Sequence, residues 1–338
     1  MPSAKPAVSD TIPQTLLGAV RYFSDPDACF NFLVGLRWKD GVACPHCEAN
    51  GITCKDVSSH SGPRKLWRCR GCRKQFSVKV GTIFEDSPLG LDKWFMTYWL
   101  LANAKNGVSS CEVARAVGVT QKSAWFMLHR IRFTLRPETL EKFRGIVEAD
   151  ETYIGGKEKN KHKDKKLNRG RGAVGKTPVM GLLERAGEGE ASQVRAAVVP
   201  DNASRSLHGE VRAHVEAGSA LFTDAWRGYN GLAPEYRRQF VDHAVKYVMG
   251  QVHTNGLENF WTLLKRTIKG TYTFTSVQHL AAYLDEQAYR FNSRGDNDGG
   301  RFVETVGFVA GKRLTYEELT HGHLTLYGGE SENGGERE

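Results

Sequence analysis

Apolar positions in the first part of the chain recur at helical spacing. Between Ile12 and Trp38, large apolar residues fall three or four positions apart on both sides of Ser24-Asp25-Pro26. An acidic residue followed by proline is a typical helix start, so we predict two helices separated by a capped turn. A further helical stretch runs from Leu91 to Phe133, whereas residues 41–80 show short apolar runs broken by turn residues, a pattern typical of small strands.

The pattern changes to longer strands in the second half of the chain. Three successive strands are followed by alternating helix and strand, an order that predicts an α/β domain of the RNase H-like type. A short helix is also predicted at 137–143, before the first of these strands. The predicted elements are strands 146–154, 177–183 and 194–199, helix 204–216, strand 220–223 and helix 256–268.

Composition adds size and charge to this picture. A chain of 338 residues predicts two or three folded units, and its formal net charge of +9 favours a polyanionic partner. No apolar run approaches the length that spans a bilayer, and the first residues lack the apolar segment of a secretory signal. We therefore expect a cytoplasmic protein whose cysteines are reduced.

Two Cys-x-x-Cys pairs bound the segment of small strands. Each tight turn directs two thiolates at one tetrahedral ion, so the pairs predict a structural zinc site with no open position for chemistry. Ordinary buried cysteines are the alternative, which gives no reason for paired spacing. His46 and Cys54 compete as ligands without that spacing, and Cys29 and Cys111, on apolar helix faces, are predicted to be core thiols. The predicted zinc ligands are Cys44, Cys47, Cys69 and Cys72.

A helix-turn-helix is predicted between Ser109 and Arg132. Gly118 marks the turn, and Thr120 caps a second helix. If this second helix recognises DNA, its exposed N-terminal side chains reach base edges and its last arginines contact phosphates. A plain helical hairpin is the alternative, and the neighbouring cysteine module and the positive charge favour the DNA-binding interpretation. The candidate contacts are Gln121, Lys122, Ser123, Arg130 and Arg132.

A basic stretch with several glycines, 157–176, lies between the first two long strands. We predict a mobile loop that holds DNA through salt-sensitive phosphate contacts. The tail 328–338 is polar, glycine-rich and acidic, and no structure is predicted for it. The DNA-binding candidates from the loop and from helix 256–268 are Lys163, Lys165, Lys166, Arg169, Arg171 and Arg266.

Carboxylates mark a second candidate metal site. Strand alternation puts Glu148 and Asp150 on one face of strand 146–154, and an acid in an apolar strand is costly unless it is paired or bound to metal. Asp224 directly follows the apolar strand 220–223, at the carboxyl end where open α/β sheets form their sites. Two aspartates so placed are candidates to share metal ions. The alternative is that Asp150 caps or pairs with a basic neighbour and that Asp224 only opens a turn.

Helix 256–268 presents a buried stripe and, beside it, a polar stripe. Along the polar stripe, Asn255 and Glu258 lie about two turns before Lys265, so an amide or acid ligand accompanies a lysine that can hold a phosphate. The alternative is a capping box, with Asn255 as the N-cap and Glu258 at the third helical position.

Taken together, these motifs resemble bacterial insertion-sequence transposases with an N-terminal zinc ribbon and a DDE-type catalytic domain. The resemblance runs from about Phe23 to Asn292. It rests on Arg37-Trp38-Lys39-Asp40-Gly41, on Gly81-Thr82-Ile83-Phe84, on Asp150-Glu151-Thr152-Tyr153-Ile154-Gly155-Gly156, and on His253-Thr254-Asn255 leading to Glu258 and Trp261.

The resemblance implies an RNase H-like domain in which Asp150, Asp224 and a third residue bind two Mg²⁺ or Mn²⁺ ions. The family's third position is glutamate or asparagine, so Glu258 and Asn255 compete, and the spacing to Lys265 favours Glu258. The implied reaction is DNA cleavage and strand transfer at the ends of an insertion sequence by in-line displacement. A transposase-derived regulator without catalysis and a zinc-ribbon nuclease without strand transfer are the rival interpretations.

The predicted partners and domains follow from these motifs. DNA is the expected partner, as element ends and as target, with no membrane; pairing of two ends predicts a homo-oligomer, and DNA binding predicts association with the nucleoid. The predicted domains are an N-terminal helical segment 1–40, a zinc ribbon 41–80, a helix-turn-helix region 81–143, an RNase H-like domain 144–295 containing the basic loop, and a C-terminal extension 296–338.

Overall fold

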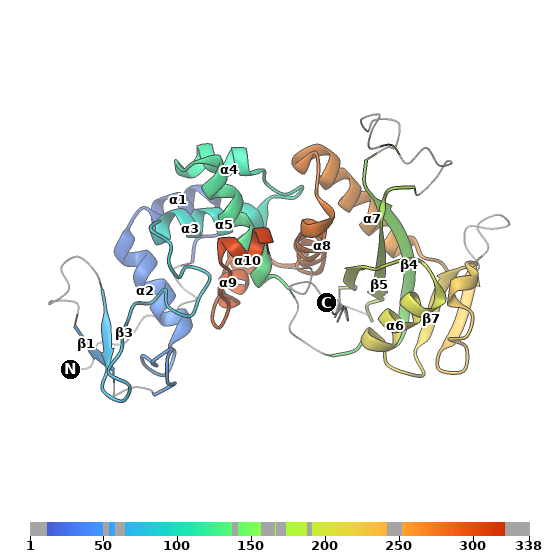
Figure 1. Cartoon of the computed structure of the whole chain (residues 1–338), viewed down its shortest axis with the longest axis horizontal. Helices are drawn as coiled ribbons and strands as arrows, with labels where there is room; N and C mark the ends of the chain where they lie inside the picture. The colour runs from blue at the N-terminus through green and yellow to red at the C-terminus, as the bar shows by residue number, and fades with distance from the viewer. Residues whose placement is uncertain are drawn as a thin grey trace, which may run out of the picture. The chain divides into compact units, whose positions relative to one another are not determined.

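The computed structural model is described for residues 12–49, 54–57, 65–136, 141–156, 166, 174–187, 191–241 and 252–321. The chain divides into two compact units, one formed by residues 1–135 together with 296–338 and the other by residues 136–295 (Figure 1). None of the helices in these described ranges combines the length and the apolar character that a bilayer crossing needs.

The first unit is mainly helical, as its apolar spacing predicts. Thr15 caps the helix α1 (Leu16–Phe23) and Asp25 caps α2 (Pro26–Arg37), which confirms the pair of helices with a turn between them. The unit also contains α3 (Leu91–Asn103), α4 (Ser110–Val117) and α5 (Gln121–Thr134), and from the C-terminal part of the chain α9 (Asp298–Gly307) and α10 (Tyr316–His321).

Helix α9 completes the core of this first unit. The ring of Phe302 is fully buried, with its centroid 4.9 Å from that of Phe23, 5.5 Å from that of Phe32 and 5.7 Å from that of Trp99. These three aromatic residues belong to helices near the start of the chain. Residues from 296 onwards therefore belong structurally with the N-terminal unit, a partnership that the apolar pattern did not predict.

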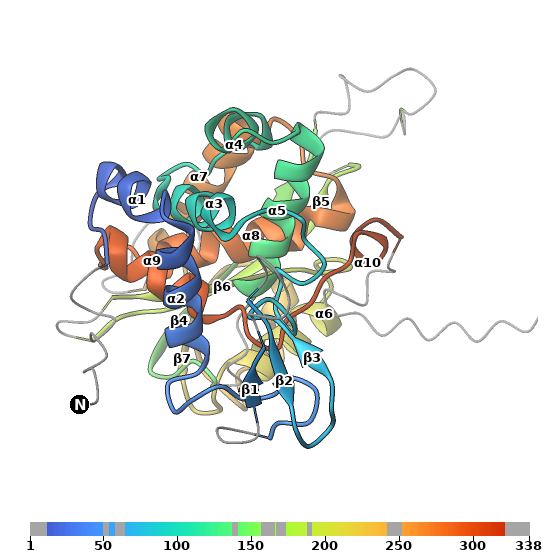
Figure 2. The same cartoon turned by 90° about the vertical axis from the view of Figure 1, so that its left-hand side faces the viewer.

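A small antiparallel sheet follows α2. It consists of β1 (Cys54–Asp56), β2 (Trp67–Cys69) and β3 (Gln75–Phe76), which lie side by side in Figure 2. The rings of Trp67 and Phe76 stack with centroids 6.0 Å apart, and Trp38 lies edge-on to Trp67 at 5.1 Å. Three aromatic rings thus pack against one another in the interior of this small module.

The second unit is built on a five-stranded sheet of order β6-β5-β4-β7-β8. Its strands are β4 (Ile146–Ile154), β5 (Thr177–Glu184), β6 (Gln193–Val198), β7 (Ala220–Asp224) and β8 (Arg237–Val241). The central strand β4 is antiparallel to β5 and parallel to β7, which is in turn parallel to β8. This mixed sheet with flanking helices confirms the α/β class and is the arrangement that an RNase H-like domain requires.

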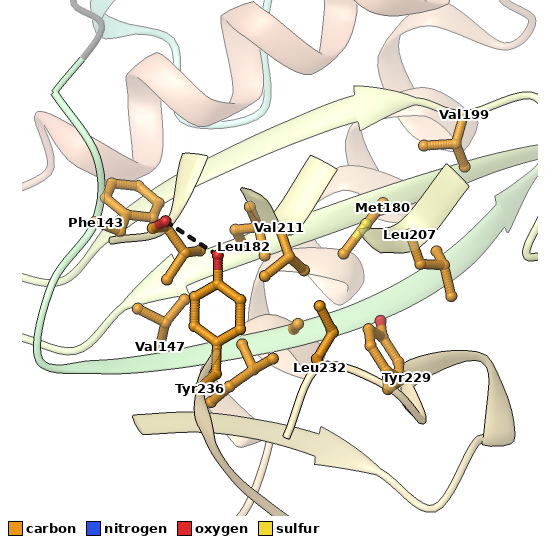
Figure 3. Packing of buried hydrophobic residues seen from close by; sticks show 13 residues of the cluster. Phe143, Val147, Met180, Leu182, Val199, Leu207, Val211, Tyr229, Leu232 and Tyr236 are labelled. Carbon is orange, nitrogen blue, oxygen red and sulfur yellow. Dashed lines mark hydrogen bonds between the residues drawn. The ribbon is translucent and has the colours of Figure 1, made fainter. Parts of the chain in front are cut away.

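Two apolar cores cover the two faces of this sheet. On one face, Val147 and Ala149 pack with Leu207 and Val211 of α6 (Ser204–His214), as Figure 3 shows for the labelled residues. On the other face, α7 (Asn255–Thr267) and α8 (Val277–Asn292) pack on the sheet through residues that include Leu257. Strand alternation in β4 therefore decides which of its side chains meet α6 and which meet α7.

The structure contradicts one predicted element. The helix expected at 137–143 is absent over its described residues 141–143, where Phe143 forms a parallel bridge with Val215 and donates its backbone N–H to the His214 carbonyl at 2.8 Å. The apolar side chain that suggested a helix is instead held in an extended segment that enters the sheet core.

Candidate functional site

The four predicted zinc ligands come together at the small sheet. The Sγ atoms of Cys44 and Cys72 are 3.6 Å apart and those of Cys47 and Cys69 are 3.7 Å apart, and all four lie within 4.8 Å of one another. Four thiol sulfurs converging on one point match the tetrahedral donor set of a structural zinc ion. Residues of two separate turns thus form the site that the paired spacing predicted.

Of the two cysteines predicted to be core thiols, one is buried and the other is exposed. Cys29 is fully buried in α2 and its thiol faces the Phe23 carbonyl at 3.4 Å, as expected of a core thiol. Cys111 is exposed on α4, so its prediction as a core thiol is wrong. In that helix the buried position is Val113, which leaves Cys111 on the solvent side.

The predicted helix-turn-helix elements are present in α4 and α5. Ser109 and Glu112 form a capping box at the start of α4, Gly118 adopts a left-handed conformation with φ 64° at its end, and Thr120 accepts the Ser123 N–H at 3.1 Å to cap α5. Gln121 and Lys122 are exposed, although Gln121 donates to the Ser110 hydroxyl at 2.8 Å. Ser123 is half-buried beside its cap.

The two arginines near the end of α5 contradict their predicted role. Arg130 is 5% exposed and Arg132 only 1%. The guanidinium of Arg130 donates to the carbonyls of Leu314 at 2.8 Å, Ile83 at 2.7 Å and Glu85 at 2.9 Å. Arg130 is enclosed by carbonyls and Arg132 is almost fully buried, so neither guanidinium is accessible to a phosphate and the prediction that these arginines bind DNA is wrong.

Of the candidates in the basic loop, only Lys166 falls within the described residues, where it is partly exposed. Lys163, Lys165, Arg169 and Arg171 lie outside them, as does the acidic tail. Arg266 is exposed near the end of α7.

Asp150 lies on β4 with its side chain towards α7, on the same face as Glu148, as alternation predicted for the pair. Its Oδ2 accepts the indole N–H of Trp261 at 2.9 Å. Gly181 lies directly opposite Asp150 on β5, and a Cβ atom there would be 2.6 Å from the Trp261 ring. The absence of a side chain at Gly181 therefore gives the Trp261 indole room to cross β5 and reach Asp150. The sequence indicated only that Trp261 belongs to the buried stripe of its helix, and not that it contacts the aspartate.

Charged groups of two other elements, β7 and α7, act on Asp150. Burial, together with the negative charges of Asp224 and Glu258, raises its pKa to about 6, against the opposing effect of the Trp261 hydrogen bond. Burial also lowers the pKa of Lys265, and the attraction of Asp150 opposes that shift. A partly buried carboxylate among two other acids and a lysine is the electrostatic setting expected where a cation and a phosphate are bound.

Asp224 occupies the predicted place at the carboxyl end of β7. Its Oδ1 accepts the backbone N–H of Trp226 at 2.9 Å, so it also shapes the turn that follows, as the alternative interpretation proposed. Among the described residues, only the four cysteines form a group whose ligand atoms all lie within 4.8 Å. The carboxylates of Asp150, Asp224 and Glu258 are therefore more widely spaced than that.

The start of α7 contradicts the capping-box alternative. Thr254 is the N-cap and makes no side-chain capping bond, so Asn255 is the first helical residue. Asn255 and Glu258 are both exposed, one turn apart. Both remain candidates for the third ligand, and of the two only the charge of Glu258 contributes to the raised pKa of Asp150.

The Glu148 side chain on β4 supplies the capping hydrogen bond that Thr254 does not make. Its carboxylate is 1% exposed, accepts the Leu257 N–H at 3.0 Å and pairs with Arg185 at 2.7 Å. Arg185 also donates to the His253 carbonyl at 2.8 Å, and a Cβ atom on Gly256 would lie 2.8 Å from the Glu148 carboxylate. These contacts fix the start of α7 on β4. Alternation placed Glu148 on the face of Asp150, but nothing local indicated its partner.

Comparisons with known proteins agree with this arrangement. Residues 142–292 match the model of the ISXO2-like transposase domain, and residues 24–75 match that of the transposase zinc-ribbon domain. The first match covers the sheet with α6, α7 and α8, and the second covers α2 with most of the small sheet.

Two curated relatives are also similar. An uncharacterised protein in the transposable element ISH50 of Halobacterium salinarum is 27% identical over 281 residues, which cover 78% of this chain and 90% of that protein. An uncharacterised transposase-like protein of Haemophilus influenzae is 29% identical over 102 residues, 30% of this chain and 82% of that protein.

Proposed function

Because the chain belongs to the insertion-sequence transposases that carry an N-terminal zinc ribbon, we propose that its second unit cleaves and joins DNA at the ends of an insertion sequence. The observation that carries this proposal is that Asp150 on β4 is partly buried and feels the charges of Asp224 on the neighbouring strand β7 and of Glu258 and Lys265 on α7. Oxygen donors of this kind suit Mg²⁺ or Mn²⁺.

Each residue of this site has a distinct proposed task. Asp150, Asp224 and Glu258 would hold two Mg²⁺ or Mn²⁺ ions, which when bound activate the attacking oxygen and stabilise the leaving one. The Trp261 indole engages Oδ2 of Asp150 and so fixes the rotation of that carboxylate. Lys265, at about two turns from Glu258, would bind a non-bridging oxygen of the phosphate.

The first unit would supply recognition of the DNA ends. Gln121 and Lys122 at the start of α5 are exposed and suit contacts to base edges. The four cysteines hold the small sheet through structural zinc, which leaves no open position for chemistry. Because two ends must be brought together for joining, the working form is proposed to be a homo-oligomer on DNA.

The test is a cleavage and joining assay on DNA that carries the source element's ends. Wild type is compared with Asp150→Asn, Asp224→Asn, Glu258→Gln and Asn255→Ala in Mg²⁺ and in Mn²⁺. Removal of one metal ligand is expected to reduce product by at least about 100-fold, because each ligand holds an ion that stabilises the transition state. Exposed Asn259, next to Glu258 on α7, provides the control Asn259→Ala, which is expected to stay active.

The same assay separates the rival functions. Loss of activity in both aspartate variants supports the transposase chemistry, and the Glu258 and Asn255 variants identify the third ligand. A wild-type protein that binds the ends but neither cuts nor joins in either metal would be a regulator. Cutting without joining would identify a nuclease.

A further inference from the structure

An exposed indole lies at the edge of the sheet that carries the aspartates. Trp226 is 44% exposed and comes two residues after Asp224. Single exposed apolar side chains are common on protein surfaces, so exposure alone means little. The contacts that hold this ring are the informative feature.

The indole of Trp226 is fixed by bonds at several points. Its Nε1 donates to the Asn202 carbonyl at 3.3 Å, and its backbone N–H donates to Oδ1 of Asp224 at 2.9 Å. Nε1 would lie 2.3 Å from a Cβ atom on Gly228, so the ring edge rests against that glycine's backbone. The indole's polar atom is thus satisfied within the protein while much of its surface stays in water.

Two arginines lie next to the backbone of Trp226. Arg227 follows it and is exposed. The guanidinium of Arg238 donates to the carbonyls of Trp226 and Asp224, each at 3.4 Å. An exposed aromatic ring with arginines beside it is the combination by which proteins bind single-stranded nucleic acid, the ring stacking on a base and the cations attracting the backbone.

We propose that Trp226 is a stacking platform for an unpaired nucleobase next to the phosphodiester that reacts. This inference rests on the proposed function, because only a DNA substrate at the carboxylates brings a base to this edge. Asp224 links the two roles, since the carboxylate proposed to hold metal also anchors the backbone of Trp226. A bound base would be held in a fixed position relative to the metal site.

The test measures binding without chemistry. Wild type, Trp226→Leu and Trp226→Phe are titrated in Ca²⁺ with duplexes of the source element's end, either fully paired or with unpaired bases beside the cleavage position. Loss of the stack is expected to weaken binding of the unpaired duplex by roughly 5- to 150-fold in Trp226→Leu. Trp226→Phe is expected to retain most of the affinity, and the fully paired duplex is expected to bind all three proteins alike.

Two controls isolate the stack. Phe274→Leu changes another exposed aromatic residue of the same unit, 71% exposed between α7 and α8, and is expected to bind like wild type. A duplex with an abasic nucleotide at the unpaired position removes the base, so wild type and Trp226→Leu should then bind equally.

The inference is overturned if Trp226→Leu binds the unpaired duplex as tightly as wild type does, or if its deficit persists on the abasic duplex. Because no step of this assay needs catalysis, its result is independent of the cleavage assay. If Trp226→Leu binds more weakly but the wild-type protein never cuts DNA, the stacking role stands and the proposed cleavage activity fails. If Trp226→Leu binds normally and the wild-type protein cuts DNA, the cleavage activity stands and the stacking role fails.

Discussion

Asp150 is held in a position that is unfavourable for its own charge. It is partly buried and feels the charges of two further acids, and its Oδ2 accepts the indole N–H of Trp261. Its pKa of about 6 compares with an ordinary 3.8, so the folded protein favours the protonated acid. Sites that bind cations commonly carry such a cost, because the charge that destabilises the metal-free fold is the one that binds the metal.

This cost predicts the stability of Asp150→Asn. Since the folded pKa is raised, the stabilisation from the protonated acid is complete below about pH 4 and is lost as pH rises through about 6. In metal-free protein at pH 8, the variant should therefore raise the free energy of unfolding by at most about 3 kcal/mol, with no gain near pH 4.

Urea unfolding of wild type and Asp150→Asn at several pH values checks this expectation. Addition of Mn²⁺ at pH 8 should stabilise wild type and have little effect on the variant, because one ligand is lost. A variant less stable than wild type at pH 8 would show that the negative charge is already compensated within the protein.

At the scale of elements, the placement of α7 depends on β4 rather than on its own cap. The Glu148 carboxylate accepts the Leu257 N–H and forms an ion pair with Arg185. Both candidate third ligands lie in the first turn of the same helix. A change at Glu148 should therefore be transmitted to Glu258 and Asn255 without touching either of them.

Glu148→Gln should leave the half-buried guanidinium of Arg185 without its counter-charge and the Leu257 N–H with a weaker acceptor, at a cost of about 1–3 kcal/mol. We expect faster hydrogen exchange at the Leu257 amide and a higher Mn²⁺ requirement for cleavage. Gly256→Ala keeps all charges but crowds the same carboxylate, and should share the metal phenotype.

Glu235→Gln breaks an exposed pair with Arg212 and is the matched control, expected to unfold like wild type because solvent screens such pairs. Unchanged exchange at Leu257 in Glu148→Gln would contradict the cap.

The elements show what local pattern can and cannot predict. The strands β4, β5, β6 and β7 were predictable because buried faces impose apolar runs. The edge strand β8 was missed because it begins Arg237-Arg238-Gln239 and offers no apolar alternation. Arg130 looked like a surface cation because the carbonyls that enclose it come from distant segments, 45 to 184 residues away.

The same distinction applies to the candidate site. Asp150 and Asp224 were predictable from their places on apolar strands. The Glu148 cap was not, because its partner Leu257 lies 109 residues further along the chain and only the packed sheet brings them together.

At the scale of the whole molecule, the chain leaves the first unit, forms the second, and returns to the first. Phe302, fully buried among aromatic rings, is the central contact of that return.

Phe302→Ala should destabilise the first unit by about 3–5 kcal/mol, because a large cavity opens between α1, α2 and α3. The second unit should unfold as in wild type. Phe308→Ala, at an exposed aromatic residue just after α9, is the control and should cost less than about 1 kcal/mol. Differential scanning calorimetry resolves the two transitions, and a shift of both together would show that the units unfold as one.

The return of α9 has a consequence for synthesis. A ribosome makes α1 and α2 first, yet the residue that completes their core is made only after the entire second unit. We expect the second unit to finish folding first. Until α9 is made, the aromatic rings of α1, α2 and α3 that pack on Phe302 stay exposed to solvent. The unit that begins the chain is thus the last to be completed, and the earliest residues depend longest on protection from aggregation.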